Sequence, residues 1–270
     1  MSIPSTMHAW TIDDFGGPEV FEKREQPVPD IGPHEVLVQV RATSVNPVDY
    51  KIRRGDAAGL CPPKPATLHG DVAGSVVAVG PEVTAFEKGD DVYGCAGGYP
   101  PVPHGALADY MPCDARLLAP MPGSLSYREA ATLPLVTLTA WEALRDKAAV
   151  QADQHVLVHG ATGGVGHIGV QLAADRGCEV TATASSQRKL DLGAELGATH
   201  LVNYETEPVA DYVRRLTDED GFDVVFDTVA GDNFHRSVEA ARIYGSVATV
   251  NPQTVDLGPA YNKGLTVHLV

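Results

Sequence analysis

The segment HGATGGVGHIGVQLA, residues 159–173, limits what this chain can fold into more than any other stretch. It places four glycines between the apolar run HVLVHG and a stretch with the apolar spacing of a helix. Glycine permits tight turns and lets other groups come close to the backbone. The segment therefore predicts a strand that turns sharply into a helix, with room for a ligand at the turn.

A second strand-like run, EVTATAS, follows at residues 179–185 and completes a strand–helix–strand unit. This order is typical of units that bind a dinucleotide, whose pyrophosphate is met by the amides at the helix N-terminus. Ala161, Gly163 and Gly166 take the three small positions of that pattern. The alternative is an ordinary tight turn without a ligand. We expect the following residues to bind the cofactor: Gly160, Ala161, Thr162, Gly163, Gly164, Val165 and Gly166.

The residues after the second strand bear on which dinucleotide is bound. A site for NAD usually offers Asp or Glu there to bind the ribose 2′-hydroxyl, but no carboxylate lies between Glu179 and Asp191. Hydroxyls and positive charges, which suit the 2′-phosphate of NADP(H), stand there instead. They belong to Ser185, Ser186, Arg188 and Lys189. We expect NADP(H) as the cofactor; the alternative is that the two basic side chains only face solvent.

The two halves of the chain differ in their pattern of predicted strands and helices. Residues 1–125 contain short β-rich runs separated by proline and glycine clusters. In the second half, strand-like segments at 155–159, 179–184, 222–228, 246–250 and 265–270 alternate with helical ones near 165–176, 187–197, 208–217 and 233–242. A further helical stretch begins at a Ser126 cap and is interrupted at Pro134. We expect an α/β protein: a mostly β domain over 1–125 and a doubly wound parallel-sheet domain over 126–270.

Composition excludes several classes of partner. The formal net charge of -15 disfavours nucleic acid, because DNA and RNA are bound through clustered Lys and Arg. No stretch approaches the roughly 18 apolar residues of a membrane span, and the N-terminus lacks the regions of a secretory signal. The four cysteines are too scattered for a CxxC metal site or a disulfide framework. We expect a cytoplasmic protein with no nucleic-acid or membrane partner, whose acidity suits a high-salt host or an ordinary acidic mesophile.

Along almost its whole length the chain resembles zinc-independent medium-chain dehydrogenases/reductases of the quinone oxidoreductase type. The resemblance rests on DDFGGPEVFE, SVNPVDYKIRRG, GDVAGSVVAVGPEVTAFEKGDDVYG, EAATLPLVTLTAWEAL, GATGGVG, LGATHLVNY and GFDVVFDTVAG. It implies an N-terminal GroES-like catalytic domain, a Rossmann domain, and hydride transfer from NADPH bound between them to a quinone or an α,β-unsaturated carbonyl. It also implies that Tyr204 lies near the adenosine phosphate beside Lys189, and that Asn46 and Thr139 approach the nicotinamide.

The positions that hold zinc in metal-dependent relatives carry other residues here. Those relatives use a Cys, a His paired with Glu, and a second Cys. This sequence has Asn46 and Gly70-Asp71 at the first positions, and it lacks the four-cysteine structural lobe. His69, without thiolate partners, is interpreted as a hydrogen-bonded loop residue, and Asp49 and Asp71 as carboxylates that brace loops. We expect no metal.

Without a metal, the protein must orient the nicotinamide, donate hydrogen bonds to the substrate carbonyl and exclude water. We expect Asn46, Lys51 and Tyr50 to do this. Lys51 resembles a lysine proposed as a proton donor or carbonyl anchor in enone-reducing relatives. The alternatives are a surface role for Lys51 and donation by Tyr99.

The end of the chain suggests a second kind of function. The resembled family continues past the strand that corresponds to LTVHLV, whereas this sequence ends at Val270. A β domain short of its closing strands would expose a sheet edge. An NADPH-binding protein with little or no turnover is therefore the alternative to an enzyme. The sequence does not identify the quinone or enone, and it leaves the oligomeric state open, a homodimer included.

Overall fold

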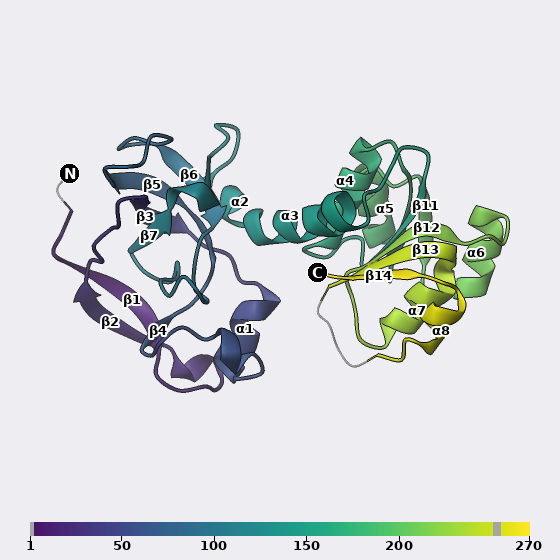
Figure 1. The fold of residues 1–270 in the computed structure, drawn as a ribbon, viewed down its shortest axis with the longest axis horizontal. Coiled ribbons are helices and arrows are strands. Elements are labelled where there is room, and N and C mark those ends of the chain that lie inside the picture. Colours follow the sequence, from purple (N-terminus) through teal and green to yellow (C-terminus); the bar gives the residue numbers. More distant parts are fainter. Residues whose placement is uncertain (1–2, 251–254) are drawn as a thin grey trace. The chain divides into compact units, whose positions relative to one another are not determined.

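The chain forms two compact units, which divide between Leu135 and Val136. The computed structural model describes residues 3–250 and 255–270. The expected α/β organisation is confirmed: an antiparallel β unit comes first, and a parallel-sheet unit follows (Figure 1). In the described part of the chain, no helix has the length and apolar character needed to cross a membrane.

The first unit is built from two antiparallel sheets. One has the strand order β2-β1-β4 and the other β7-β3-β5-β6-β8. Their bounds are β1 Thr6–Ile12, β2 Glu22–Pro27, β3 Glu35–Ala42, β4 Ala66–Thr67, β5 Asp71–Val79, β6 Asp91–Cys95, β7 Tyr110–Asp114 and β8 Leu118–Pro120. The larger sheet buries valines of β3 and β5 against Met111, which is the side-chain alternation that the runs EVLVQVRAT and VAGSVVAVG predict. Helix α1, Pro47–Arg54, follows β3.

The boundary between the units lies after helix α2, Tyr127–Ala131, and not after residue 125 as the sequence pattern suggests. Helix α2 begins at Ser126, whose backbone N–H donates to the Glu129 carboxylate at 2.8 Å. Its two buried alanines pack against Ala73 of β5, and the Tyr127 hydroxyl donates to Asp91 at 2.6 Å. These contacts tie α2 to the first unit, whereas α3, Pro134–Trp141, starts at the expected proline.

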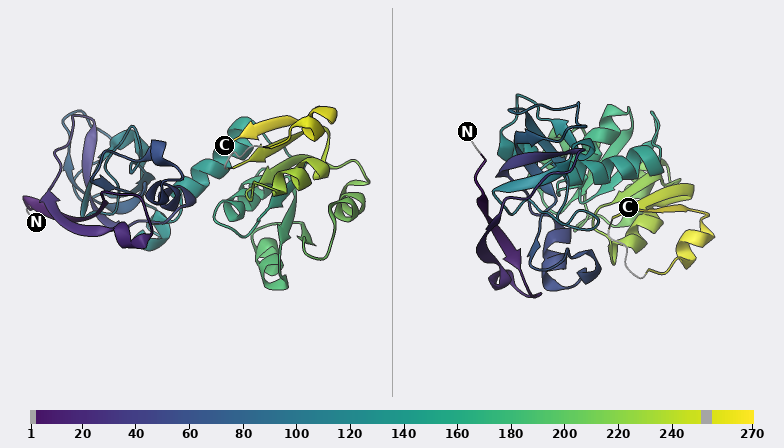
Figure 2. Two further views of the ribbon diagram at one scale, coloured as in Figure 1. Left: turned by 90° about the horizontal axis from the view of Figure 1, so that it is seen from below. Right: turned by 60° about the vertical axis from the view of Figure 1, so that its left-hand side comes forward.

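The second unit contains one six-stranded parallel sheet in the order β11-β10-β9-β12-β13-β14. The strands are β9 His155–His159, β10 Glu179–Ala184, β11 His200–Asn203, β12 Phe222–Asp227, β13 Ala241–Thr249 and β14 Thr266–Leu269. The helices are α4 Gly166–Asp175, α5 Gln187–Glu195, α6 Val209–Thr217, α7 Asn233–Ala240 and α8 Gly258–Asn262. Figure 2 shows β14 at the outer edge of the sheet from two further directions.

Helices cover both faces of the parallel sheet, as the near-continuous apolar strands predict. Val156 and Val158 of β9 pack into the core beneath α4, while Leu157 between them packs with residues of α6, α7 and α8. Figure 1 shows α4 and α5 on one side of the sheet and α7 and α8 on the other. This arrangement leaves the carboxyl ends of the strands as the edge where the connecting loops gather.

The structure differs from the expected elements at three places. Strand β11 and helix α8 were not predicted, because each is short and only partly buried. The helix expected near 233–242 ends at Ala240, and β13 begins at the next residue instead of at 246. The Lys263 ammonium binds the carbonyls of Val238, Glu239 and Ala241 at 2.7–3.0 Å, so a distant side chain ends the helix.

Candidate functional site

The glycine turn lies between β9 and α4, as the sequence predicts. Gly160 has a left-handed φ of 65°, and the Gly163 N–H donates to its carbonyl at 2.9 Å. A Cβ on Gly166 would lie 2.1 Å from the Gly160 oxygen. The close approach of backbone to backbone therefore requires glycine at position 166, and the chain enters α4 without a side chain in the turn.

The turn presents backbone donors at the start of a ten-residue helix. Among the described residues, the N–H groups of Gly164 and Val165 have no hydrogen-bond acceptor. The Gly164 position is also open, since an added Cβ would be in ordinary contact with Val136 at 3.5 Å. Two unsatisfied amides and the positive end of a helix dipole suit a phosphate. The residues present therefore fit the pyrophosphate of a dinucleotide.

The residues expected around the 2′-phosphate lie where β10 and β11 end. Ser185 and Ser186 follow β10, and the Lys189 ammonium on α5 donates to the Ser185 hydroxyl at 3.2 Å. Tyr204 follows β11, and its N–H donates to the Ala184 carbonyl at 3.3 Å. The structure thus brings these residues together at one corner of the sheet. Arg188 is exposed on the first turn of α5, and Thr139 lies on α3.

In the first unit, Asn46 and Asp71 form the centre of a buried polar cluster. The Asn46 amide donates to the Asp71 carboxylate at 2.8 Å, and the Ser44 hydroxyl donates to the same oxygen at 2.6 Å. The other Asp71 oxygen accepts the Leu135 N–H at 2.9 Å, and Asp49 accepts the Asn46 N–H at 2.7 Å. Both carboxylates brace backbone, as expected. The Asn46 side chain is fixed by Asp71.

Burial shifts the titration of this cluster. Burial raises the pKa of Asp49 to about 6, aided by the nearby charge of Asp71, and one Asp49 oxygen has no hydrogen-bond partner in the part of the chain that the structure describes. Burial also raises the pKa of Asp71, against the opposing effect of its donors Ser44 and Asn46. Burial lowers the pKa of His69 to about 4, so this imidazole is neutral at pH 7.

Tyr99 fills the space next to Gly70. A Cβ on Gly70 would lie 2.8 Å from both the Tyr99 hydroxyl and the Gly97 carbonyl oxygen. The Tyr99 hydroxyl is 2.6 Å from the Cys95 thiol, whose pKa burial raises to about 12. Burial likewise places the pKa of Tyr99 well above its usual range. Both groups are therefore protonated at neutral pH, and no side chain fits at position 70.

Tyr50 and Lys51, the other expected catalytic residues, lie on α1 next to Asn46 in sequence. The Tyr50 ring is 38% exposed and lies 5.2 Å from the Arg54 guanidinium. Lys51 is partly buried. Both are therefore more exposed than Asn46, whose buried side chain donates to Asp71.

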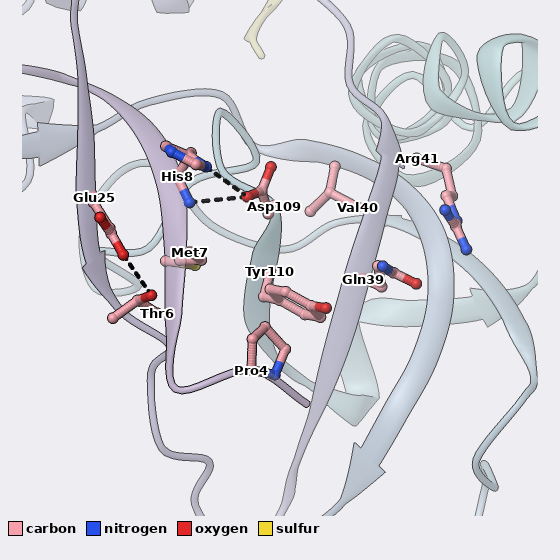
Figure 3. Close-up of a pocket in the computed structure, with 10 residues that line it drawn as sticks. All are labelled: Pro4, Thr6, Met7, His8, Glu25, Gln39, Val40, Arg41, Asp109 and Tyr110. Atoms are coloured by element: carbon pink, nitrogen blue, oxygen red, sulfur yellow. Dashed lines mark hydrogen bonds and ion pairs between the residues drawn. The ribbon is translucent and has the colours of Figure 1, made fainter. Parts of the chain in front are cut away.

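A polar pocket of about 330 Å³ lies elsewhere in the first unit, between β1, β3 and β7 (Figure 3). Its walls include the ion pair of His8 and Asp109, whose side-chain atoms are 3.7 Å apart, and the hydrogen bond from Thr6 to Glu25 at 2.6 Å. None of the predicted catalytic residues lines it. Four of its polar side chains are paired with one another, and we assign the pocket no chemistry.

Sequence reasoning missed a row of buried polar side chains at the carboxyl ends of the central strands. Asp227 of β12 stands beside His159 of β9 and Thr249 of β13, and the His159 ring nitrogen Nδ1 lies 3.2 Å from the hydroxyl of Thr183 on β10. All four are at least 95% buried: 1% exposed for Thr183, 3% for His159, 0% for Asp227 and 5% for Thr249. The signal was present in the sequence, since HVLVH and FDVVFD are apolar strands that end on an ionisable residue. We call these residues the polar row.

Comparison with known proteins identifies the family. Residues 32–123 match the alcohol dehydrogenase GroES-like domain, and residues 164–268 match the zinc-binding dehydrogenase domain. Human quinone oxidoreductase is 32% identical over 258 residues, which cover 94% of this chain and 76% of the human protein. The chain belongs to the quinone oxidoreductase family of medium-chain dehydrogenases/reductases. The expected resemblance is thereby confirmed, together with the GroES-like and Rossmann folds of the two units.

Other members of the family show how much of their length this chain spans. The 2-methylene-furan-3-one reductase of Solanum lycopersicum is 38% identical over 257 residues, which cover 93% of this chain but only 63% of the tomato protein. The crystal structure of Escherichia coli quinone oxidoreductase complexed with NADPH has a TM-score of 0.83 and 28% identity, and the match covers 98% of this chain and 80% of the other. Although one matching domain is named for zinc, no group of three or more His, Cys, Asp or Glu side chains in the described residues is placed to hold a metal ion.

Proposed function

We propose that this chain is an NADPH-dependent oxidoreductase that transfers a hydride to a quinone or an α,β-unsaturated carbonyl without zinc. The observation that carries the proposal is the glycine turn, whose open amides at the start of α4 suit a pyrophosphate. The family supports it, since its members include quinone oxidoreductases, an enone-type reductase and a structure that holds NADPH.

The roles of the residues follow from their surroundings. When bound, NADPH supplies the hydride, and the glycine turn would hold its pyrophosphate. Lys51 and Tyr50, which are partly exposed, would donate to a substrate carbonyl and stabilise the charge that develops on its oxygen. Asn46 is committed to Asp71, so its proposed role is to fix the start of α1 and thereby the two donors that α1 carries.

The surroundings of Gly70 support metal independence. Zinc relatives need a histidine at this position, where even a Cβ would meet the Tyr99 hydroxyl and a backbone oxygen at 2.8 Å.

The proposed function is tested by NADPH oxidation with a panel of quinones and enones, using protein treated with a chelator. We expect acceptor-dependent NADPH consumption that is unchanged by chelation, and no stoichiometric zinc in elemental analysis. Activity that disappears with the chelator and returns with zinc would contradict metal independence. Cofactor binding without consumption for any acceptor would favour a binding protein over an enzyme.

The cofactor preference is tested at Lys189. We expect the chain to bind NADPH more tightly than NADH, and Lys189→Ala to weaken NADPH binding by roughly 10- to 100-fold, because one charge-assisted hydrogen bond to phosphate is worth about 1.5–3 kcal/mol. NADH binding should hardly change. Arg214→Ala, which removes an exposed positive charge from α6, is the control and should alter neither affinity. Equal affinities of the unaltered protein for the two cofactors would contradict the assignment.

A further inference from the structure

The Asp227 carboxylate organises the loop that follows β12. One of its oxygens accepts three hydrogen bonds, from the N–H groups of Val229 and Ala230 at 3.1 and 2.9 Å and from the Asn233 amide at 3.0 Å. Ala230 has a left-handed φ of 62°, which costs about 1 kcal/mol for a residue with a Cβ. The carboxylate thus holds residues 228–232 in a conformation that the loop would not adopt by itself.

This loop is joined to the glycine turn. The Thr228 hydroxyl donates to the His159 carbonyl at 2.6 Å, immediately before Gly160. A Cβ on Gly160 would lie 2.7 Å from the same hydroxyl, so the two segments lie in direct contact. Val229, at the tip of the loop, is 56% exposed. The loop and the turn therefore stand side by side at the carboxyl edge of the sheet, where ligands of such sheets bind.

Two atoms of the polar row have no hydrogen-bond partner among residues 3–250 and 255–270: the second oxygen of Asp227 and Nε2 of His159. Their residues are direct neighbours in the register of β12 and β9, so both side chains leave the sheet on the same face. An ionised carboxylate only accepts hydrogen bonds, whereas a neutral imidazole donates from one nitrogen and accepts at the other. Leaving both atoms unpaired would cost several kcal/mol.

Burial lowers the pKa of His159 to about 4, against the opposing charge of Asp227, so the ring is neutral at pH 7. The groups around a neutral imidazole then determine which of its two nitrogens carries the proton. Nδ1 lies 3.2 Å from the Thr183 hydroxyl, which can donate to it, and the ring proton is then on Nε2.

We propose that His159 and Asp227 are positioning residues for the cofactor. The Thr183 hydroxyl donates to His159 Nδ1, His159 Nε2–H donates through one internal water to the second Asp227 oxygen, and Asp227 holds the 228–232 loop against the glycine turn. The relay fixes the two segments as one wall of the cofactor site without touching the cofactor itself. This inference rests on the proposed NADPH site.

The relay is tested with Asp227→Asn, which keeps the size of the side chain and one accepting oxygen for the loop. Its new amide group would face Nε2 as a donor, so His159 should change from the Nε2–H to the Nδ1–H tautomer, which NMR of the imidazole nitrogens distinguishes. NADPH binding should weaken by roughly tenfold or more, as expected for one lost charge-assisted hydrogen bond. Thr249→Val is the control from the same row, because within the described part of the chain its hydroxyl makes only a 3.5 Å contact to the Val250 carbonyl, and it should change neither readout.

The outcomes separate the relay from the proposed function. An Nε2–H tautomer in the unaltered protein that changes in Asp227→Asn, with weaker NADPH binding, supports the relay. An Nδ1–H tautomer in the unaltered protein, or equal NADPH affinity in the two proteins, would overturn it. Failure of the unaltered protein to bind NADPH would instead overturn the proposed function, whatever the tautomer. Amide hydrogen exchange at Val229 and Ala230 shows whether the loop still holds in each variant.

Discussion

Gly166→Ala is expected to abolish measurable NADPH binding and to destabilise the second unit. The added Cβ would lie 2.1 Å from the Gly160 oxygen, 2.8 Å from its carbonyl carbon and 3.0 Å from the Ala161 Cα. All three are backbone atoms, so no side chain can rotate away, and the turn between β9 and α4 must open. Overpacking of this kind costs about 1–3 kcal/mol or more. The measurements are the melting temperature and a titration with NADPH.

Gly164→Ala is the matched control for stability. It adds the same methyl group two residues earlier in the same turn, where the nearest atom is Val136 Cγ1 at 3.5 Å. Its melting temperature should stay close to that of the unaltered protein. If the two variants melt alike, the close contact at Gly166 does not hold the turn together.

Asp71→Asn is expected to destabilise the first unit by about 1–3 kcal/mol for each buried donor that it leaves without an acceptor. The asparagine oxygen can still accept the Leu135 N–H, but its amide would face the Asn46 amide and the Ser44 hydroxyl, which now both donate to the carboxylate. Asp71 is fully buried, so water cannot replace the lost acceptor. Chemical denaturation measures the change.

The control for Asp71 is Asp114→Asn at the end of β7. Asp114 pairs with the exposed Arg116 guanidinium at 2.6 Å, and exposed ion pairs contribute about 0–1 kcal/mol. A loss of stability at Asp71 no larger than that at Asp114 would contradict the role of the Asn46–Asp71 cluster. Asp71→Asn protein that remains folded should also lose NADPH turnover if Asn46 positions α1.

The sequence predicts those parts of the structure that are determined by interactions between residues close together in the chain. The strand–turn–helix around Gly160 and the Ser126 cap follow from residues adjacent in the chain, and both are seen. The end of α7 could not be predicted, because the ammonium that stops the helix belongs to Lys263, more than twenty residues away. Short β11 is held by pairing with β10 and has little pattern of its own.

The candidate site likewise has one part that local sequence predicts and another that depends on contacts between distant residues. The glycine turn is local and was predicted, whereas the hydrogen bond of Leu135 to Asp71 and the strand pairing of Asp227 with His159 join residues more than sixty positions apart. Nothing in a single strand shows which buried carboxylate will meet which imidazole or amide. The space that Tyr99 takes beside Gly70 depends likewise on the loop between β6 and β7.

The central claim is that this chain moves a hydride from NADPH to an electron-poor carbonyl compound. The most direct measurement uses NADPH that carries deuterium at the transferable position, mixed with chelator-treated protein and an enone, followed by mass spectrometry of the product. The account predicts one deuterium in the reduced enone, on the carbon β to the carbonyl, and a slower reaction with the corresponding NADH. A product without deuterium, or no product with any quinone or enone while NADPH remains bound, would contradict it.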